Sequence, residues 1–290
     1  MVTCSLRLRL PSLCALVVAA VSSAGRPALA GEPPDLRFVH LSDTHCRPAR
    51  RNPRSRLPVD PLAKDLVRSF RLLEAAVEDI NRHVKPDFAV VTGDLADRPN
   101  DTASLRRVKA ILDDLQCPWY PVVGNHDGAR AWTRVFGARR RNYVFRDKGW
   151  RFIALDSSRG RFTVATRAWL RRVLDADQAT PTALLTHYPL VLPEAHKTAA
   201  RRLYGAGRLV LADADDVLGL LSRHGNVKAV FAGHCHVPVT TREAGLAHHI
   251  APALVTLGHH YAVVEAKGGR CATTYRAVAP GAATGAGRQD

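Results

Sequence analysis

The chain has 290 residues, of which 46% are hydrophobic and 23% are charged, so it is long enough for one large domain with a buried core. This composition excludes a disordered chain, a collagen-like repeat and a multi-span membrane protein. Lys and Arg outnumber Asp and Glu by 42 to 26, which gives a formal net charge of +16 and would favour nucleic acid, an anionic membrane or anionic substrates.

The first thirty residues have the pattern of a signal peptide. Arg7 and Arg9 precede an apolar run of 12 residues, 10–21, and residues 28–30 read Ala-Leu-Ala before Gly31. A membrane-spanning helix needs roughly 20 apolar residues. We therefore expect residues 1–30 to be cleaved, with an uncleaved anchor as the alternative. This predicts export to the periplasm or the extracellular space, and no transmembrane segment in the mature chain.

Removal of the signal peptide leaves four cysteines and, after the loss of three arginines, a net charge of +13. Four cysteines allow three disulfide pairings. The sequence does not choose among these pairings of Cys46, Cys117, Cys235 and Cys271. Most of the remaining arginines are dispersed along the chain, which favours attraction of small anions over a nucleic-acid interface.

The rest of the chain alternates short apolar runs with helical patterns, which predicts an α/β fold. Strands are expected at 36–41, 88–91, 120–123, 152–155, 183–185 and 229–231, and again within 237–264. Helices are expected at 62–84, 105–115, 166–176 and 213–224, and loops at 47–60 and 193–210. We expect one domain over residues 31–270, followed at 271–290 by a strand end and a flexible tail.

Polar residues that commonly bind metals follow the predicted strands, at the edge where open α/β sheets carry their sites. The blocks are Asp43-Thr44-His45, Gly93-Asp94, Gly124-Asn125-His126-Asp127, His187 and Gly233-His234-Cys235-His236. Imidazole and carboxylate groups suit Zn, Mn and Fe, so the pattern indicates a centre of two metal ions. Glycines inside these blocks permit sharp turns and close approach of backbones.

The order DxH, GD, GNHD, H, GHxH, which spans about residues 36–264, resembles the calcineurin-like metallophosphoesterase superfamily. The resemblance implies a four-layer α/β/β/α sandwich and two divalent or trivalent transition metal ions (Mn, Fe or Zn). It further implies that one ion is bound by Asp43, His45 and His236, the other by Asn125, His187 and His234, and that Asp94 bridges both. A hydroxide held between the two ions would then attack the phosphorus.

The resemblance also implies roles for two residues beside the metals. His126 would protonate the leaving oxygen or steady the phosphoryl group, and Asp97 would orient His126, with a helix cap as the alternative for Asp97. Asp127 is expected to cap a helix that starts near Ala129.

The branch of the superfamily follows from positions at which this sequence departs from the motifs of other branches. Asp97 stands where purple acid phosphatases carry a Tyr ligand, and Val123 replaces the Arg that precedes Gly-Asn-His in protein phosphatases. The terminal GHxH pair resembles the class III cyclic-nucleotide phosphodiesterases and the glycerophosphodiesterases. The predicted function is hydrolysis of a small phosphodiester, and in a wider reading also of monoesters. The alternatives are a metal-dependent nuclease and a non-catalytic polyanion-binding protein on the same fold; the oligomeric state is not determined by the sequence.

Overall fold

The computed structural model describes residues 36–49, 64–204, 207–256 and 258–278. The chain divides into two units, Met1–Glu32 and Pro33–Asp290, and the description below concerns the second. The predicted signal peptide and the tail from Pro280 lie outside the described residues, so both stay predictions. No helix among the described residues is long and apolar enough to cross a membrane.

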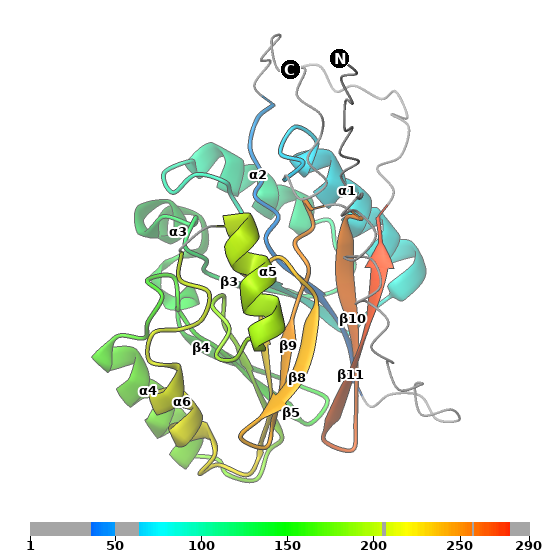
Figure 1. Ribbon diagram of the computed structural model, residues 1–290. Helices are drawn as coiled ribbons and strands as arrows, with labels where there is room; N and C mark the ends of the chain where they lie inside the picture. The colour runs from blue at the N-terminus through cyan, green and yellow to red at the C-terminus, as the bar shows by residue number, and fades with distance from the viewer. Residues whose placement is uncertain (1–35, 50–63, 205–206, 257, 279–290) are drawn as a thin grey trace, which may run out of the picture. The chain divides into compact units, whose positions relative to one another are not determined.

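Two sheets form the centre of the fold (Figure 1). The first has the order β11-β10-β1-β2-β3, with bounds β1 Leu36–Leu41, β2 Phe88–Thr92, β3 Trp119–Val122, β10 His260–Lys267 and β11 Arg270–Ala277. The second has the order β4-β5-β6-β7-β9-β8, with bounds β4 Tyr143–Asp147, β5 Trp150–Ala154, β6 Thr182–Leu185, β7 Val227–Ala232, β8 Val239–Glu243 and β9 Leu246–Ile250. The strands β1, β2 and β3 are parallel to one another, as are β5, β6, β7 and β9.

Helices cover the outer face of each sheet. They are α1 Ser69–Asp79, α2 Thr102–Leu112, α3 Ala129–Phe136, α4 Val164–Asp175, α5 Glu194–Tyr204 and α6 Ala214–Leu221, with a π-helical turn η3 Ile80–Val84 and a 3-10 turn η4 Ala138–Arg140. The helices α1, α2 and α3 share a buried cluster with the first sheet, whereas α4 and α6 share one with the second, and lie side by side in Figure 1.

The two sheets pack face to face through aromatic side chains. Phe38 of β1 stacks on Phe88 of β2 with ring centroids 5.0 Å apart, and it meets Phe231 of β7 edge-on at 5.1 Å. Because side chains alternate along a strand, Phe38 faces the other sheet while Val39 faces the helices. The result is a helix–sheet–sheet–helix arrangement in one domain, which confirms the predicted four-layer α/β/β/α sandwich.

Two local predictions were wrong, and one strand was not predicted. The helix expected from residue 62 begins only at Ser69, because residues 64–68 leave the helical path where Asp65 N donates to Val255 O at 2.7 Å. The loop expected at 193–210 contains α5, in a stretch that has Pro193 before it, Glu194 in its first turn and several alanines, all of which favour a helix. The strand β4 was not expected at all; its residues alternate between half-buried and exposed as an edge strand does.

Candidate metal centre

The predicted site residues lie just beyond the carboxyl ends of parallel strands. Asp43 follows β1, Asp94 follows β2 and His187 follows β6, each by two residues. Two backbone hydrogen bonds fix the first two loops together, since Asp43 N donates to Gly93 O at 3.1 Å and His45 N donates to Asp94 O at 2.9 Å. Residues far apart in the sequence therefore meet at one edge of the paired sheets.

Backbone strain is concentrated at this edge. Nine described non-glycine residues have a positive φ, a conformation that costs on the order of 1–3 kcal/mol each outside glycine. Five of these nine are predicted metal ligands: Asp43, His45, Asp94, His234 and His236. Strain of this kind persists only where the surrounding structure imposes it, and it is typical of functional sites.

Asp43, His45 and His236 form a buried group of possible metal ligands. Nε2 of His236 lies 3.2 Å from Oδ1 of Asp43 and 3.2 Å from Nε2 of His45. Oδ2 of Asp43 accepts hydrogen bonds from the Ser42 hydroxyl at 2.6 Å and from His234 N at 2.9 Å. Oδ1 of Asp43 is buried and accepts none, which leaves it available to a cation.

Asp94, His187 and His234 form a second such group. Nε2 of His187 lies 3.4 Å from Oδ1 of Asp94, 3.2 Å from Nδ1 of His234 and 2.9 Å from Oδ1 of Asn125. The other nitrogen of each imidazole donates to a backbone carbonyl, Nδ1 of His187 to Thr92 at 2.8 Å and Nε2 of His234 to Arg208 at 2.7 Å. Outer hydrogen bonds of this kind orient metal-binding histidines in proteins.

The Asp94 carboxylate reaches both groups. Its Oδ1 lies beside His187, while its Oδ2 lies 3.6 Å from Nε2 of His45. All seven predicted ligand side chains are thus brought together, with one carboxylate at the centre. Oxygen and imidazole donors in this arrangement fit two first-row transition metal ions.

The electrostatics of the cluster favour bound cations. Burial raises the pKa of Asp94, but the imidazoles of His187 and His45 outweigh it and hold that pKa well below its usual range. Burial lowers the pKa of His45 well below its usual value, and burial with the nearby His187 lowers the pKa of His234 to about 4. For His187 burial is outweighed by the Asp94 carboxylate, and the pKa rises to about 9. The Asp94 carboxylate is therefore ionised, and its negative charge favours a bound cation beside it.

Comparison with known proteins agrees with this geometry. The profile of the family described as Calcineurin-like phosphoesterase matches residues 36–238. The chain belongs to this family. The predicted superfamily is confirmed, and the chain is a metallophosphoesterase, a hydrolase of phosphoric esters.

Relatives and solved structures support the assignment. A protein of Synechococcus sp. named as a cyclic nucleotide phosphodiesterase is 30% identical over 216 residues, which is 71% of this chain and 76% of the relative. A protein of Arcobacter nitrofigilis named as a glycerophosphodiester phosphodiesterase is 28% identical over 216 residues, 70% of this chain and 72% of the relative. A dimetal phosphatase from Danio rerio superposes with a TM-score of 0.66 at 16% identity, covering 84% of this chain and 96% of that one, and so shares the fold.

In this calcineurin-like phosphoesterase, His126 is oriented by a carbonyl. Its Nδ1 lies 2.7 Å from the backbone oxygen of Asp97, and its Nε2 lies 3.9 Å from Oδ2 of Asp94. The Asp97 carboxylate forms its own contacts, with Oδ2 accepting from Arg47 at 3.1 Å and Oδ1 3.6 Å from Nδ1 of His45. One of its oxygens also lies within 4.8 Å of a ring nitrogen of His126. Asp97 contacts His126 as expected, but through its main chain.

Asp127 does not cap a helix, contrary to the prediction. The residue before α3 is Gly128, and no side chain caps that helix. Oδ1 of Asp127 accepts from the amides of Leu95 and Ala96, and Oδ2 accepts from Gly124 N at 2.9 Å. Burial, together with the nearby Asp94, raises the pKa of Asp127 to about 6. Asp127 ties the loops after β2 and β3 together, which places Asp94 beside Asn125.

Two residues beside the centre were missed by the sequence analysis. Nζ of Lys64 lies 2.9 Å from Nε2 of His45, and the ring of Tyr188 packs on His234 with centroids 3.9 Å apart. Lys64 fell inside the wrongly predicted helix, and no motif marks a lysine at this distance from His45. Tyr188 directly follows His187, which was the only available signal.

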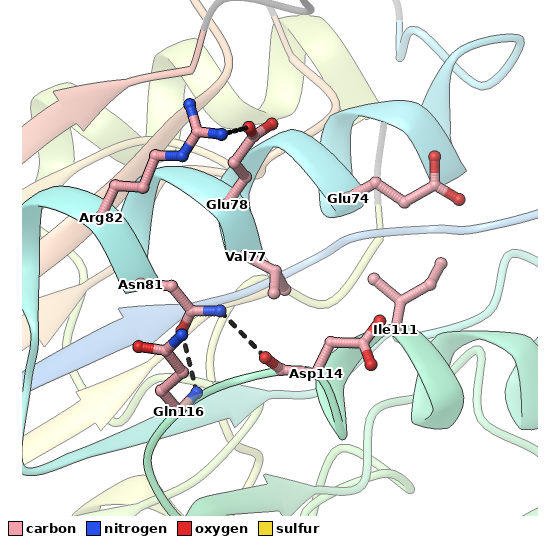
Figure 2. Close-up of a pocket in the computed structure, with 8 residues that line it drawn as sticks. All are labelled: Glu74, Val77, Glu78, Asn81, Arg82, Ile111, Asp114 and Gln116. Atoms are coloured by element: carbon pink, nitrogen blue, oxygen red, sulfur yellow. Dashed lines mark hydrogen bonds and ion pairs between the residues drawn. The ribbon is translucent and has the colours of Figure 1, made fainter. Parts of the chain in front are cut away.

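A separate surface groove of about 330 Å³ contains none of these residues (Figure 2). It lies along α1 and the end of α2, and it is lined by Glu74, Val77, Glu78, Asn81, Arg82, Ile111, Asp114 and Gln116. Its polar groups satisfy one another, for example Arg82 with Glu78 at 2.7 Å and Asn81 Nδ2 with Asp114 O at 2.9 Å. The cysteines of the described residues, Cys46, Cys117, Cys235 and Cys271, form no disulfide with one another.

Proposed function

We propose that this metallophosphoesterase hydrolyses small phosphodiesters with two transition metal ions, Mn, Fe or Zn. Asp43, His45 and His236 hold one ion, Asn125, His187 and His234 hold the other, and Asp94 bridges them. The observation that carries this proposal is the Asp94 carboxylate, whose two oxygens lie 3.6 Å from Nε2 of His45 and 3.4 Å from Nε2 of His187.

The chemistry divides between the ions and the chain. Two cations bound by these residues would activate water and neutralise charge on the phosphoryl group. The chain positions them through Asp94 and sets its own proton donor beside them. Because Nδ1 of His126 is occupied by the Asp97 carbonyl, Nε2 is the nitrogen that gains and releases the proton for the leaving oxygen.

The proposal includes both the substrate class and the cellular location of the protein. The names of the two relatives, a cyclic nucleotide phosphodiesterase and a glycerophosphodiester phosphodiesterase, share the phosphodiester bond, which supports diesters as the class. The signal-peptide pattern of residues 1–30 supports a substrate in the periplasm or outside the cell.

The test is an Asp94→Asn variant assayed on bis(p-nitrophenyl) phosphate and p-nitrophenyl phosphate with Mn, Zn, Fe or chelator. Loss of an outer partner of a metal ligand costs about 10–100-fold, so we expect loss of the bridging charge to cost more than about 100-fold in kcat/KM. His234→Ala or His236→Ala should cost less, since each contacts one ion. Asp114→Asn, an exposed carboxylate outside the centre, is the matched control. Wild-type activity in Asp94→Asn, or activity that resists chelation, would overturn the two-metal assignment.

A further inference from the structure

A small basic pocket adjoins the metal centre. Its volume is about 220 Å³, and it is lined by Lys197, Arg201, Gly207, Arg208, Leu209 and Val210. Pockets for whole drug-sized ligands measure about 300–1,000 Å³, so this one fits a single substituent group. Lys197 and Arg201 come from α5, the helix that the sequence did not predict.

Arg208 connects the pocket to the centre. Its backbone oxygen accepts from Nε2 of His234 at 2.7 Å, so the residue that lines the pocket also orients a proposed metal ligand. Its side chain crosses Gly160 so closely that a Cβ on that glycine would lie 2.7 Å from Cδ of Arg208 and 3.8 Å from Cζ of Tyr188. Tyr188 in turn packs on His234. The pocket and the reacting phosphate would therefore be neighbours along the surface.

The pocket has an excess of positive charge. Among the described contacts, neither Arg201 nor Arg208 forms an ion pair, and Lys197 meets Glu194 at 3.4 Å. The Glu194 side chain is 74% exposed, and ion pairs of that kind contribute little. Two guanidinium groups that have no carboxylate partner among the described residues, beside a site for a phosphate ester, are suited to a second phosphate.

We infer that this pocket binds a second anionic group, a phosphate monoester, on a phosphodiester substrate whose reacting phosphate lies at the metal centre. The inference rests on the proposed function. It narrows the substrate class to diesters that carry a further terminal phosphate, and it makes Arg201 and Arg208 specificity-determining residues.

The experiment compares three thymidine dinucleotides: TpT, pTpT and TpTp. For the wild-type enzyme we expect one of the phosphorylated dinucleotides to have a KM on the order of tenfold below that of TpT. Arg201→Gln should bring that KM to within about twofold of the TpT value, with kcat on bis(p-nitrophenyl) phosphate unchanged. Arg208→Gln should have the same effect on that KM. Arg208→Gln retains the carbonyl that holds His234. Arg171→Gln, an exposed arginine of α4 without an ion pair among the described residues, is the charge-matched control and should leave all three KM values unchanged.

The outcomes separate this inference from the proposed function. Chelator-sensitive hydrolysis of bis(p-nitrophenyl) phosphate with equal KM for all three dinucleotides would overturn the pocket alone, as would an equal effect of the Arg171 control. If no diester is hydrolysed, the proposed function fails. In that case calorimetric titration with pTpT, TpTp and TpT decides the pocket: tighter binding of a phosphorylated dinucleotide, lost in the Arg201 variant, supports it, and equal binding overturns it.

Discussion

At the scale of single residues, Asp97 has two separate roles, one for its backbone carbonyl and one for its side-chain carboxylate. The carbonyl of Asp97 orients the imidazole, while its carboxylate pairs with Arg47. A substitution of the Asp97 side chain therefore retains this carbonyl contact, whereas a substitution of His126 removes the proton donor itself. The pair of variants distinguishes general-acid chemistry from loop structure.

We predict that His126→Ala slows esters with poor leaving groups far more than aryl esters. General-acid assistance is worth about 10²–10⁴-fold, and a stable phenolate needs little of it. Bound metal should not change, because His126 is outside the proposed ligand set. The measurement is a leaving-group series with metal analysis on the same preparation.

Asp97→Asn is the control for this series and should keep the wild-type leaving-group dependence. If His126 only fixed the loop that carries Asn125, its alanine variant would lose metal and slow all esters alike. An equal loss across the series with metal retained would mean that His126 steadies the phosphoryl group and is not the acid.

The glycines of the site loops are fixed by close packing, as the sequence predicted. A Cβ on Gly124 would lie 2.2 Å from Asp94 N and 2.3 Å from Oδ1 of Asp94. We predict that Gly124→Ala lowers the free energy of unfolding by on the order of 3 kcal/mol and reduces bound metal. Gly219→Ala in helix α6, where a Cβ would meet nothing within 4 Å, should instead raise it by about 0.5–1 kcal/mol. Urea unfolding of both variants measures the difference, and an equal loss in the two would contradict the prediction.

At the scale of elements, the sequence predicts the buried strands well and the edges poorly. A run such as Phe88–Thr92, which is buried throughout, can be predicted from its apolar and β-branched composition. The edge strand β4, in which two of the five residues are exposed and the other three half-buried, cannot be predicted in this way. The start of α1 and the formation of α5 depend on tertiary contacts and on helix-forming residues between motifs, which an apolar pattern does not record.

The features of the site likewise divide into those that the sequence predicts and those that it does not. Its motif side chains could be predicted because their spacing is specific to the family. The role of the Asp97 carbonyl could not be, because a sequence identifies side chains and not main-chain partners. Lys64 and the basic pocket come from segments without a motif, and only the fold brings them to the centre.

One half-buried carboxylate, that of Asp79, links α1 to the strands β10 and β11. Asp79 accepts from the Tyr261 hydroxyl at 2.5 Å and from Nε and Nη2 of Arg276 at 3.0 Å each. Burial raises the pKa of Asp79, but the hydrogen bonds from Arg276 and Tyr261 outweigh it and lower that pKa to about 2. The ionised form is therefore favoured by folding.

We predict that Asp79→Asn lowers the free energy of unfolding at pH 7 by about 2 kcal/mol, as expected for charged hydrogen bonds. A depressed pKa contributes stability that is present above the unfolded value of about 4 and is lost as pH falls toward about 2. The gap between wild type and variant should thus shrink as the pH falls below 4. Urea unfolding across this range tests it, with Asp114→Asn as control. A gap that widens below pH 4 would contradict the assignment.

At the scale of the whole molecule, the basic excess is partly neutralised by ion pairs on many elements. Examples are Arg37–Glu265, Arg107–Glu74, Arg146–Asp177 and Arg167–Asp213. These pairs connect strands and helices in both sheets and leave no long series of unpaired arginines on one of the described elements. Arg201 and Arg208 are two of the arginines without an ion pair among the described contacts, and they lie together at the pocket. A charge pattern of this kind favours capture of small anions over wrapping of a polymer.

The last prediction concerns that distinction and tests the polyanion-binding alternative. Binding of a nucleic acid that neutralises Z phosphates changes log K with log salt by a slope of about −0.7Z for single strands. If only the pocket contacts phosphates, through Lys197, Arg201 and Arg208, Z is about 3, and we expect a slope near −2 for a labelled single-stranded DNA in chelator. A surface built for polyanions would engage six or more phosphates and give a slope steeper than about −4. Fluorescence anisotropy between 0.05 and 0.2 M salt measures it, and Arg201→Gln should flatten the slope by about 0.7. A steep slope together with no chelator-sensitive hydrolysis of any diester would identify a polyanion-binding protein on this fold, because its affinity would then come from many dispersed charges and not from one site.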